Sequence, residues 1–222
     1  MGKNKLAKFE ENLNFSNLFQ LPACMVDWQA PWKGKWKENY FKNNNPLILE
    51  VGCGKGEYTV ELARKHADRN YIGMDIKGAR LWRGCKTAEE NAMQNVAFLR
   101  TKAEFLDRIF APKEVSEIWV TFPDPQPNKE NKRLTSPAFL ERYAKILDTD
   151  GIIHLKTDDT ALYEYTFHQV VEKNAHIILD NTSDLYAPEE TYREMMDIQT
   201  FYEKRWLQEG KKIKYISFRL RK

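Results

Sequence analysis

The sequence has no long apolar run. Its 222 residues contain no stretch of about 18 consecutive apolar residues, the length needed to cross a bilayer. The first residues, Met1 to Lys5, are polar and basic, and no apolar signal-peptide core follows them. The three cysteines lie far apart and form no CxxC motif, and an odd number of thiols favours a reducing compartment. We therefore expect a cytoplasmic protein with no membrane partner.

The sequence also contains few histidines and has a small net charge. The four histidines are scattered without metal-ligand spacing, so no metal is expected. The net charge of +3 is too small an excess to indicate a nucleic-acid-binding protein. The charge is unevenly distributed, however, because residues 204–222 are strongly basic and residues 180–203 strongly acidic. A basic surface offset by acidic pockets would give such a total.

Short apolar segments rich in β-branched residues alternate with segments of helical period. Near-continuous apolar runs suit strands that are covered on both faces, as in a parallel sheet. Strands are predicted at 47–51, 71–75, 96–99, 118–122 and 152–155, and two later strands at 176–179 and 215–218. This alternation predicts an open, doubly wound α/β domain, to which the late pair could add an antiparallel edge. We expect one domain over residues 46–222, with residues 1–45 as a basic and aromatic N-terminal extension.

Three helices can be placed from their apolar stripes and caps. One begins with Ser136 as its cap and Pro137 at its first position. Its stripe is Phe139, Tyr143, Ile146 and Leu147. A second stripe consists of Tyr163, Phe167, Val170 and Val171. An amphipathic helix is expected to start near Thr200.

The strongest chemical signal is the loop Glu50-Val-Gly-Cys-Gly-Lys-Gly-Glu57, between the first strand and a helix. Its GxGxG spacing differs from the GxGxxG of dinucleotide-binding loops. Glu50 and Glu57 suit a cationic ligand better than a pyrophosphate, and S-adenosylmethionine carries both a sulfonium and an ammonium group. Asp75 ends the second strand, where a carboxylate can accept both ribose hydroxyls. We predict an S-adenosylmethionine site, a purely structural glycine turn being the alternative. Cys53 is interpreted as a small loop residue, because no histidine base lies near it in the sequence.

The fourth predicted strand runs into Phe122-Pro-Asp-Pro-Gln-Pro127. Three prolines stiffen this segment and prevent both helix and strand from continuing. Asp124 is therefore either a carboxylate presented to a substrate or the cap of a proline-rich turn. Further polar clusters follow at Lys129–Arg133, at Lys156–Asp159 and at Thr200–Arg205.

The motifs EVGCGKGE, GMD, FPDP, KRL, LKTD and TFYEKR, in this order, resemble the bacterial tRNA (guanine-N7-)-methyltransferase family. The resemblance covers about residues 45–222. The glycine loop is shared with most Rossmann-like methyltransferases, whereas FPDP followed by KRL, LKTD and TxxE is much more specific. The resemblance implies a Rossmann-like, seven-stranded class I S-adenosylmethionine-dependent methyltransferase fold. It also implies N7 methylation of the guanosine at position 46, in the variable loop of tRNA.

The resemblance assigns roles to individual residues. It implies that the cofactor is bound by Glu50, Gly52, Gly54, Asp75 and Asp124, with Asp124 also in the catalytic position. The substrate guanosine would contact Asp158, Thr200, Phe201, Tyr202 and Glu203. Two positions depart from the family pattern. Lys102 stands where a carboxylate is common, and Asn128 stands where a substrate-contacting lysine is usual, with Lys129 one residue further along as a substitute.

The implied chemistry is compatible with a sparse site. Guanine N7 has an in-plane lone pair, so methyl transfer needs no prior deprotonation and depends on alignment and desolvation. Asp124 would orient the base by accepting N–H bonds and would offset the positive charge of the product ring.

Structured RNA is recognised by shape and by phosphate contacts. Candidate contacts are the 129–133 loop and the N-terminal lysines Lys3, Lys5 and Lys8. A further basic and aromatic stretch contains Trp28, Trp32 and Trp36, for which packing in the core is the alternative.

Two other functions remain open. One is an S-adenosylmethionine enzyme that methylates an exocyclic nitrogen of RNA, DNA or protein, although such enzymes typically carry an Asn/Asp-Pro-Pro-aromatic motif. The other is a non-catalytic tRNA-binding module. A monomer and a homodimer are equally compatible with the sequence.

Overall fold

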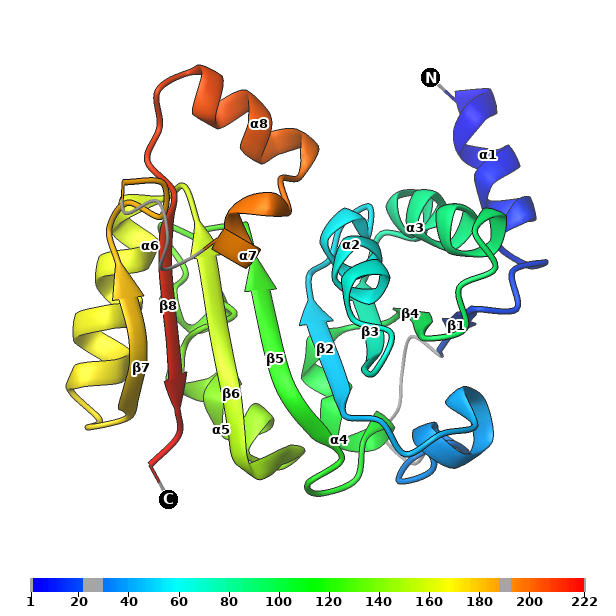
Figure 1. Ribbon diagram of the computed structural model, residues 1–222, viewed down its shortest axis with the longest axis horizontal. Helices are drawn as coiled ribbons and strands as arrows, with labels where there is room; N and C mark the ends of the chain where they lie inside the picture. The colour runs from blue at the N-terminus through cyan, green and yellow to red at the C-terminus, as the bar shows by residue number, and fades with distance from the viewer. Residues whose placement is uncertain (1, 22–29, 188–192, 222) are drawn as a thin grey trace.

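The computed structural model describes residues 2–21, 30–187 and 193–221. These residues form an eight-stranded sheet in the order β1-β4-β3-β2-β5-β6-β8-β7 (Figure 1). All pairs from β1 to β6 are parallel, and β8 is antiparallel to both β6 and β7. The strands are β1 Leu18–Gln20, β2 Leu47–Val51, β3 Asn70–Asp75, β4 Val96–Arg100, β5 Val115–Thr121, β6 Leu147–Thr157, β7 Ile177–Thr182 and β8 Lys214–Arg219.

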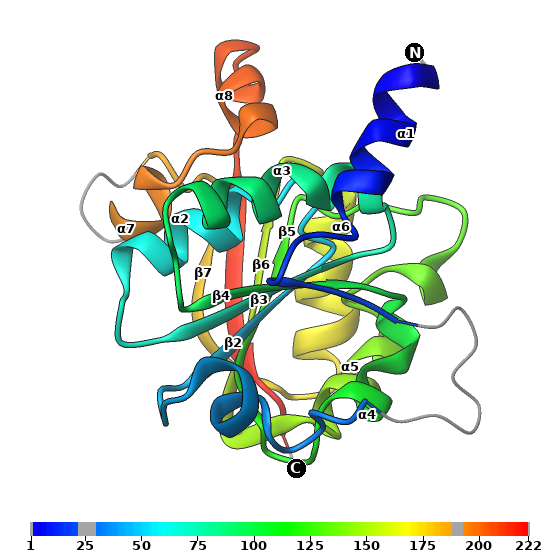
Figure 2. The ribbon, with the colours of Figure 1, turned by 90° about the vertical axis from the view of Figure 1, so that its right-hand side faces the viewer.

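Helices cover both faces of the sheet (Figure 2). One face packs against α2 and α3 through a buried cluster that includes Tyr58, Leu81 and Phe98. The other face packs against α5 and α6 through a second cluster that includes Tyr143 and Leu162. The helices are α1 Gly2–Glu11, η1 Trp36–Phe41, α2 Glu57–Lys65, α3 Gly78–Glu90, η2 Ala103–Phe105, α4 Leu106–Ile109, η3 Glu130–Lys132, α5 Pro137–Ala144, α6 Thr160–Glu164, η4 Tyr165–Glu172, α7 Arg193–Asp197 and α8 Phe201–Gln208. None of these helices is long and apolar enough to pass through a bilayer.

All seven predicted strands are confirmed, as is the antiparallel edge formed by β7 and β8. The sequence analysis missed β1, since three residues are too few to show a periodic pattern. It also placed one helix end wrongly, because α5 stops at Ala144 and Leu147 already belongs to β6. Ser136 precedes α5 as predicted, but its hydroxyl donates to the carbonyl of Asn131 instead of capping the helix.

The end of α1, strand β1 and residues 30–45 pack on the rest of the fold. Strand β1 extends the sheet beside β4, and Glu11 of α1 accepts hydrogen bonds from Trp82 (2.6 Å) and Lys86 (2.8 Å) of α3. Trp36 is fully buried and donates to the carbonyl of Ile109 at 3.2 Å. Trp32 packs on Trp36 with ring centroids 5.3 Å apart, so both side chains belong to the core. Trp28 lies outside the described residues.

The carboxyl ends of the parallel strands β2, β3, β5 and β6 meet at one edge of the sheet. In Figures 1 and 2, α1 and α8 project from this same edge, on either side of the ends of the central strands. In open α/β sheets this edge is the usual location of a ligand site.

Candidate active site

The glycine-rich loop between β2 and α2 forms a tight turn at this edge. The backbone N–H groups of Gly52 and Cys53 both donate to the carbonyl of Met74, at 2.8 and 2.9 Å. Gly54 and Gly56 have φ of +59° and +70°, a region that residues with a Cβ rarely adopt. A Cβ on Gly56 would lie 2.5 Å from the Phe98 ring, whereas a Cβ on Gly54 would meet no atom within 4 Å. Gly56 thus permits close packing, and Gly54 faces open space.

The Asp75 carboxylate is fixed against this loop. Its Oδ2 accepts from the backbone N–H of Gly54 at 3.0 Å, and its Oδ1 accepts from that of Lys77 at 2.7 Å. Each carboxylate oxygen can accept a further hydrogen bond. The side chain is therefore held in a single orientation, with acceptor capacity left for two hydroxyls.

Glu50 lies beneath the loop and is only 3% exposed. Its carboxylate accepts from the hydroxyls of Thr59 and Thr121. Burial raises the pKa of Glu50, and the two threonine hydrogen bonds oppose that shift only in part. A buried carboxylate of this kind favours a cation placed next to it.

Cys53 behaves as a small loop residue. It is buried and unpaired, and burial raises the pKa of its thiol well above the usual value. Because the thiolate is the nucleophilic form, burial and the raised pKa both argue against a nucleophilic role for Cys53.

The Phe122–Pro127 segment continues from β5 as a strained, braced turn. Phe122 and Gln126 have φ of +47° and +45°, and such strain is typical of functional sites. Asp124 is exposed, and its Oδ1 accepts from the backbone N–H of Gln126 at 3.1 Å. Arg133 braces the turn by donating to the carbonyl of Pro125 at 3.0 Å. The segment therefore holds Asp124 at the strand end and at the same time uses it as a turn cap.

Arg133 does not serve as the phosphate contact that the sequence suggested for the 129–133 loop. It is 6% exposed and stacks over the ring of Tyr165, with its guanidinium 4.2 Å from the ring centroid. Lys129 and Lys132 of the same loop are exposed, as is Asn128.

The start of α8 returns to the glycine-rich loop, although the two segments are far apart in sequence. Thr200 caps the helix by accepting from the N–H of Glu203 at 3.3 Å. The N–H of Phe201 donates to Glu57 at 2.8 Å, and the Lys55 ammonium lies 4.8 Å from the centroid of the Phe201 ring. Thr200 and Tyr202 line the same cavity as Glu50, Gly52 and Gly54. The structure thus brings together the glycine loop and three of the four predicted residues of the 200–203 segment.

Asp158 and Glu203 carry ionic partners. Asp158 is partly buried and pairs with Lys211 at 3.3 Å. Glu203 is fully buried, and its Oε1 lies 2.8 Å from both the Lys156 ammonium and the Tyr186 hydroxyl. Its Oε2 has no hydrogen-bond partner within the described part of the chain.

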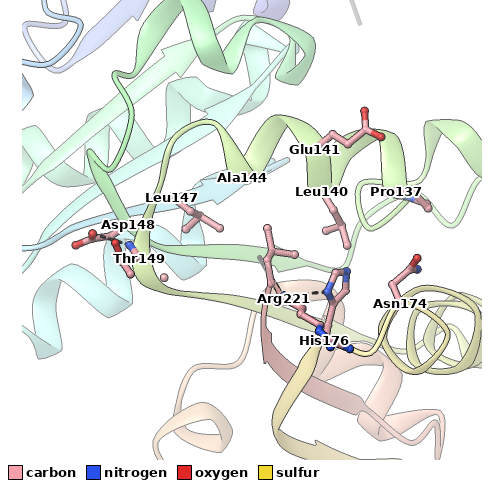
Figure 3. A pocket seen from close by; sticks show the side chains of 12 residues that line it. Pro137, Leu140, Glu141, Ala144, Leu147, Asp148, Thr149, Asn174, His176 and Arg221 are labelled. Carbon is pink, nitrogen blue, oxygen red and sulfur yellow. Dashed lines mark hydrogen bonds between the residues drawn. The ribbon is translucent and has the colours of Figure 1, made fainter.

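A second cavity lies at the opposite edge of the sheet, between α5, the start of β6 and the end of β8 (Figure 3). At about 320 Å³ it is larger than the cavity of about 110 Å³ beside the glycine loop. Its lining, which includes Leu140, Leu147 and His176, contains none of the predicted site residues. The candidate active site is therefore identified by the residues that line the cavity and not by the cavity's volume. No group of three or more His, Cys, Asp or Glu side chains suited to a metal occurs among the residues described.

Comparison with known proteins gives the family. A family model described as "Putative methyltransferase" matches residues 44–216. A tRNA (guanine-N(7)-)-methyltransferase of Christiangramia forsetii is 51% identical and covers 99% of both chains. The Bacteroides fragilis protein of that name is 50% identical over 99% of this chain and 87% of its own. The chain belongs to the tRNA (guanine-N(7)-)-methyltransferase family.

The fold is confirmed by a solved structure, that of the 16S rRNA methyltransferase KamB. It superposes with a TM-score of 0.65 at 15% identity and covers 91% of this chain and 99% of that one. The fold is therefore that of the class I S-adenosylmethionine-dependent methyltransferases, here with β1 added at one edge.

Several residues of this family member were not predicted from the sequence. Thr59 and Thr121 hold Glu50, and Arg80 of α3 lines the glycine-loop cavity. Isolated threonines and a single arginine in a helix carry no pattern that a sequence analysis can detect. Lys156 did carry a signal, because a lysine in an otherwise apolar strand requires a buried partner.

Proposed function

We propose that this methyltransferase acts in the cytoplasm and transfers the methyl group of S-adenosylmethionine to N7 of guanosine 46 in the variable loop of tRNA. One observation carries the proposal. The glycine loop, with Glu50 below it and Asp75 beside it, shares a cavity with Thr200 and Tyr202 in a chain 51% identical to a tRNA (guanine-N(7)-)-methyltransferase. Cofactor-binding and guanosine-binding groups then lie next to one another.

The residues present fit S-adenosylmethionine. When bound, the cofactor supplies an electrophilic methyl group on a positively charged sulfur. The open space beside Gly54 lets the cofactor approach the backbone, and Asp75 has acceptor capacity for the ribose hydroxyls. Glu50 contributes negative charge from below the loop. Lys102 is exposed after β4, so the carboxylate common in the family at this position is replaced by a cation.

Asp124 is proposed as the catalytic residue. Its carboxylate is exposed at the carboxyl end of β5, on a turn fixed by Arg133 and by two residues with positive φ. Because N7 of guanine already has a lone pair, no general base is required. Asp124 accepts N–H bonds from the base and offsets the positive charge that develops on the ring.

The guanosine is proposed to lie between this turn and the start of α8. Phe201 and Tyr202 are 58% and 47% exposed, and aromatic side chains of this kind stack on unpaired bases. Glu203 is fully buried, and its Oε2 has no partner among the described residues, so we propose that it contacts a guanine N–H once the start of α8 opens to admit the base. We propose that Asp158, Asn128 and Lys129 complete the substrate contacts from neighbouring loops.

Basic residues on both sides of the site are proposed to contact tRNA phosphates. Lys5 of α1 and Lys129 and Lys132 of the loop before α5 are exposed. The side chain of Lys3 is outside the described set, and Lys8 lies 4.4 Å from the centroid of the Trp82 ring. Since α1 and α8 project from the same edge, a tRNA could be held between them.

The test uses a tRNA transcript in which only the variable-loop guanosine is replaced by 7-deazaguanosine. This analogue keeps the shape and the Watson–Crick edge of the base but has C–H in place of N7. We expect labelled S-adenosylmethionine to methylate the unmodified transcript and to leave the substituted one unlabelled. Equal labelling of the two transcripts would refute the proposal, and would favour methylation of another atom.

A further inference from the structure

Lys156 is a buried cation at the carboxyl end of β6. Its side chain is fully buried, and its ammonium donates to the carbonyls of Met195 (2.7 Å) and Ile198 (3.1 Å). The third acceptor is Glu203 Oε1, at 2.8 Å. An ammonium has three N–H donors, so these three acceptors satisfy the charged form completely.

The pair formed by Lys156 and Glu203 is sensitive to the loss of either partner. Burial lowers the pKa of Lys156 and raises that of Glu203, while their mutual ion pair opposes both shifts. Removing one partner would leave an uncompensated charge in the protein interior, which is strongly unfavourable. The contact is therefore a firm anchor for residues 195–203, which include the end of α7 and the start of α8.

Lys156 also contacts the turn that carries Asp124. Its backbone carbonyl accepts from the N–H of Phe122 at 2.8 Å, directly before the Pro123–Pro127 segment. One residue thus joins both walls of the proposed guanosine site, the turn through its backbone and the start of α8 through its side chain. In Figure 1, α8 lies beyond the upper ends of β5 and β6, and α7 lies at the tip of β5.

We propose that Lys156 is a positioning residue that sets the start of α8 against the Asp124 turn and so aligns the guanosine with the cofactor. This inference rests on the proposed function. The side chain has no exposed surface and acts through Glu203 and the two carbonyls. By holding Glu203 Oε1, it fixes the first turn of α8, which carries the exposed rings of Phe201 and Tyr202.

The test compares Lys156→Met with Lys145→Met as a matched control. Methionine is uncharged and similar in length, and the Lys145 side chain is exposed and pairs with Asp107 at 3.4 Å. Each variant is studied in three assays: methylation kinetics, which give kcat and KM for tRNA, titration with S-adenosylhomocysteine, which gives its Kd, and amide hydrogen exchange of residues 199–209.

For Lys156→Met we expect kcat to fall about 100-fold, the loss caused by misplacing a substrate by about 1 Å. The Kd for S-adenosylhomocysteine should stay within about threefold of wild type, since cofactor contacts are retained. Exchange of residues 199–209 should become at least about tenfold faster while that of α2 is unchanged, as expected for local opening. Lys145→Met should match wild type in all three measurements.

Lys156→Gln replaces the methionine variant if that variant does not fold. Glutamine keeps N–H donors for the carbonyls but carries no charge. The fall in kcat and the faster exchange are therefore expected again, but both should be smaller. Unchanged kcat and unchanged exchange would overturn the inference, and so would a parallel loss of S-adenosylhomocysteine binding, which would indicate general damage. The exchange measurement requires no methylation. If the wild-type protein made no 7-methylguanosine, the proposed function would be refuted. Faster exchange in Lys156→Met would then still support the role of Lys156 in holding residues 195–203.

Discussion

Alanine substitutions at two glycines of the cofactor loop are expected to affect protein stability and cofactor binding to different degrees. Gly54 and Gly56 both have positive φ, so alanine at either position costs about 1–2 kcal/mol of backbone strain. Alanine at 56 also brings its Cβ to 2.5 Å from Phe98, which adds about 1–3 kcal/mol of overpacking. Alanine at 54 meets no protein atom, but it occupies the space proposed for the cofactor.

The expected melting temperatures follow from these numbers. For a chain of this size, each kcal/mol lowers the melting temperature by about 2–4 °C. Gly54→Ala should therefore lose about 2–8 °C and Gly56→Ala about 4–20 °C. Calorimetric titration with S-adenosylhomocysteine should show at least about tenfold weaker binding for Gly54→Ala. Wild-type affinity in Gly54→Ala would refute the placement of the cofactor, and equal destabilisation of the two variants would refute the packing argument for Gly56.

Four further predictions concern single side chains. Glu50→Gln should be more stable than wild type at neutral pH, because burial raises the pKa of Glu50 and stability is lost as pH rises through that raised value. The advantage should vanish near the ordinary carboxyl pKa of about 4.3, and a constant melting difference across pH would contradict this. Asp124→Ala should slow methyl transfer by about 10²–10³-fold in single-turnover assays while leaving cofactor affinity nearly intact, and near-normal turnover would exclude it as catalytic. Arg133→Lys should lower kcat about tenfold, since lysine keeps the charge but loses the planar stacking on the Tyr165 ring, and an unchanged kcat would show that the turn needs no brace. Trp36→Ala should cost about 3–5 kcal/mol in denaturant unfolding, and a smaller loss would contradict its core role.

Much of the fold could be predicted because the pattern of a parallel sheet is strong. The central strands are near-continuous apolar runs, such as Leu47–Val51, in which four of five residues are apolar and all five are buried. Strand β1 could not be predicted, since its three residues are recruited by pairing with β4. The end of α5 was misplaced because an apolar residue at position 147 fits the stripe of a helix as well as the start of a strand, and Leu147 belongs to β6.

The candidate site was predicted in part. Motif residues such as Gly54 and Asp75 are adjacent in the structure, because Gly54 lies in the loop after β2, Asp75 ends β3, and the two strands are neighbours. The role of Arg133 could not be inferred, since a charged loop residue gives no sign that it is buried under a turn. Glu203 likewise gives no indication in the sequence that Lys156 is its partner. Contacts between segments distant in sequence are what the structure adds.

The central claim is the identity of the methylated atom. The most direct test incubates unmodified tRNA with methyl-labelled S-adenosylmethionine and the purified protein, digests the RNA and identifies the labelled nucleoside. The account predicts label in 7-methylguanosine. Label in any other nucleoside, or cofactor binding without transfer of label to tRNA, would contradict it.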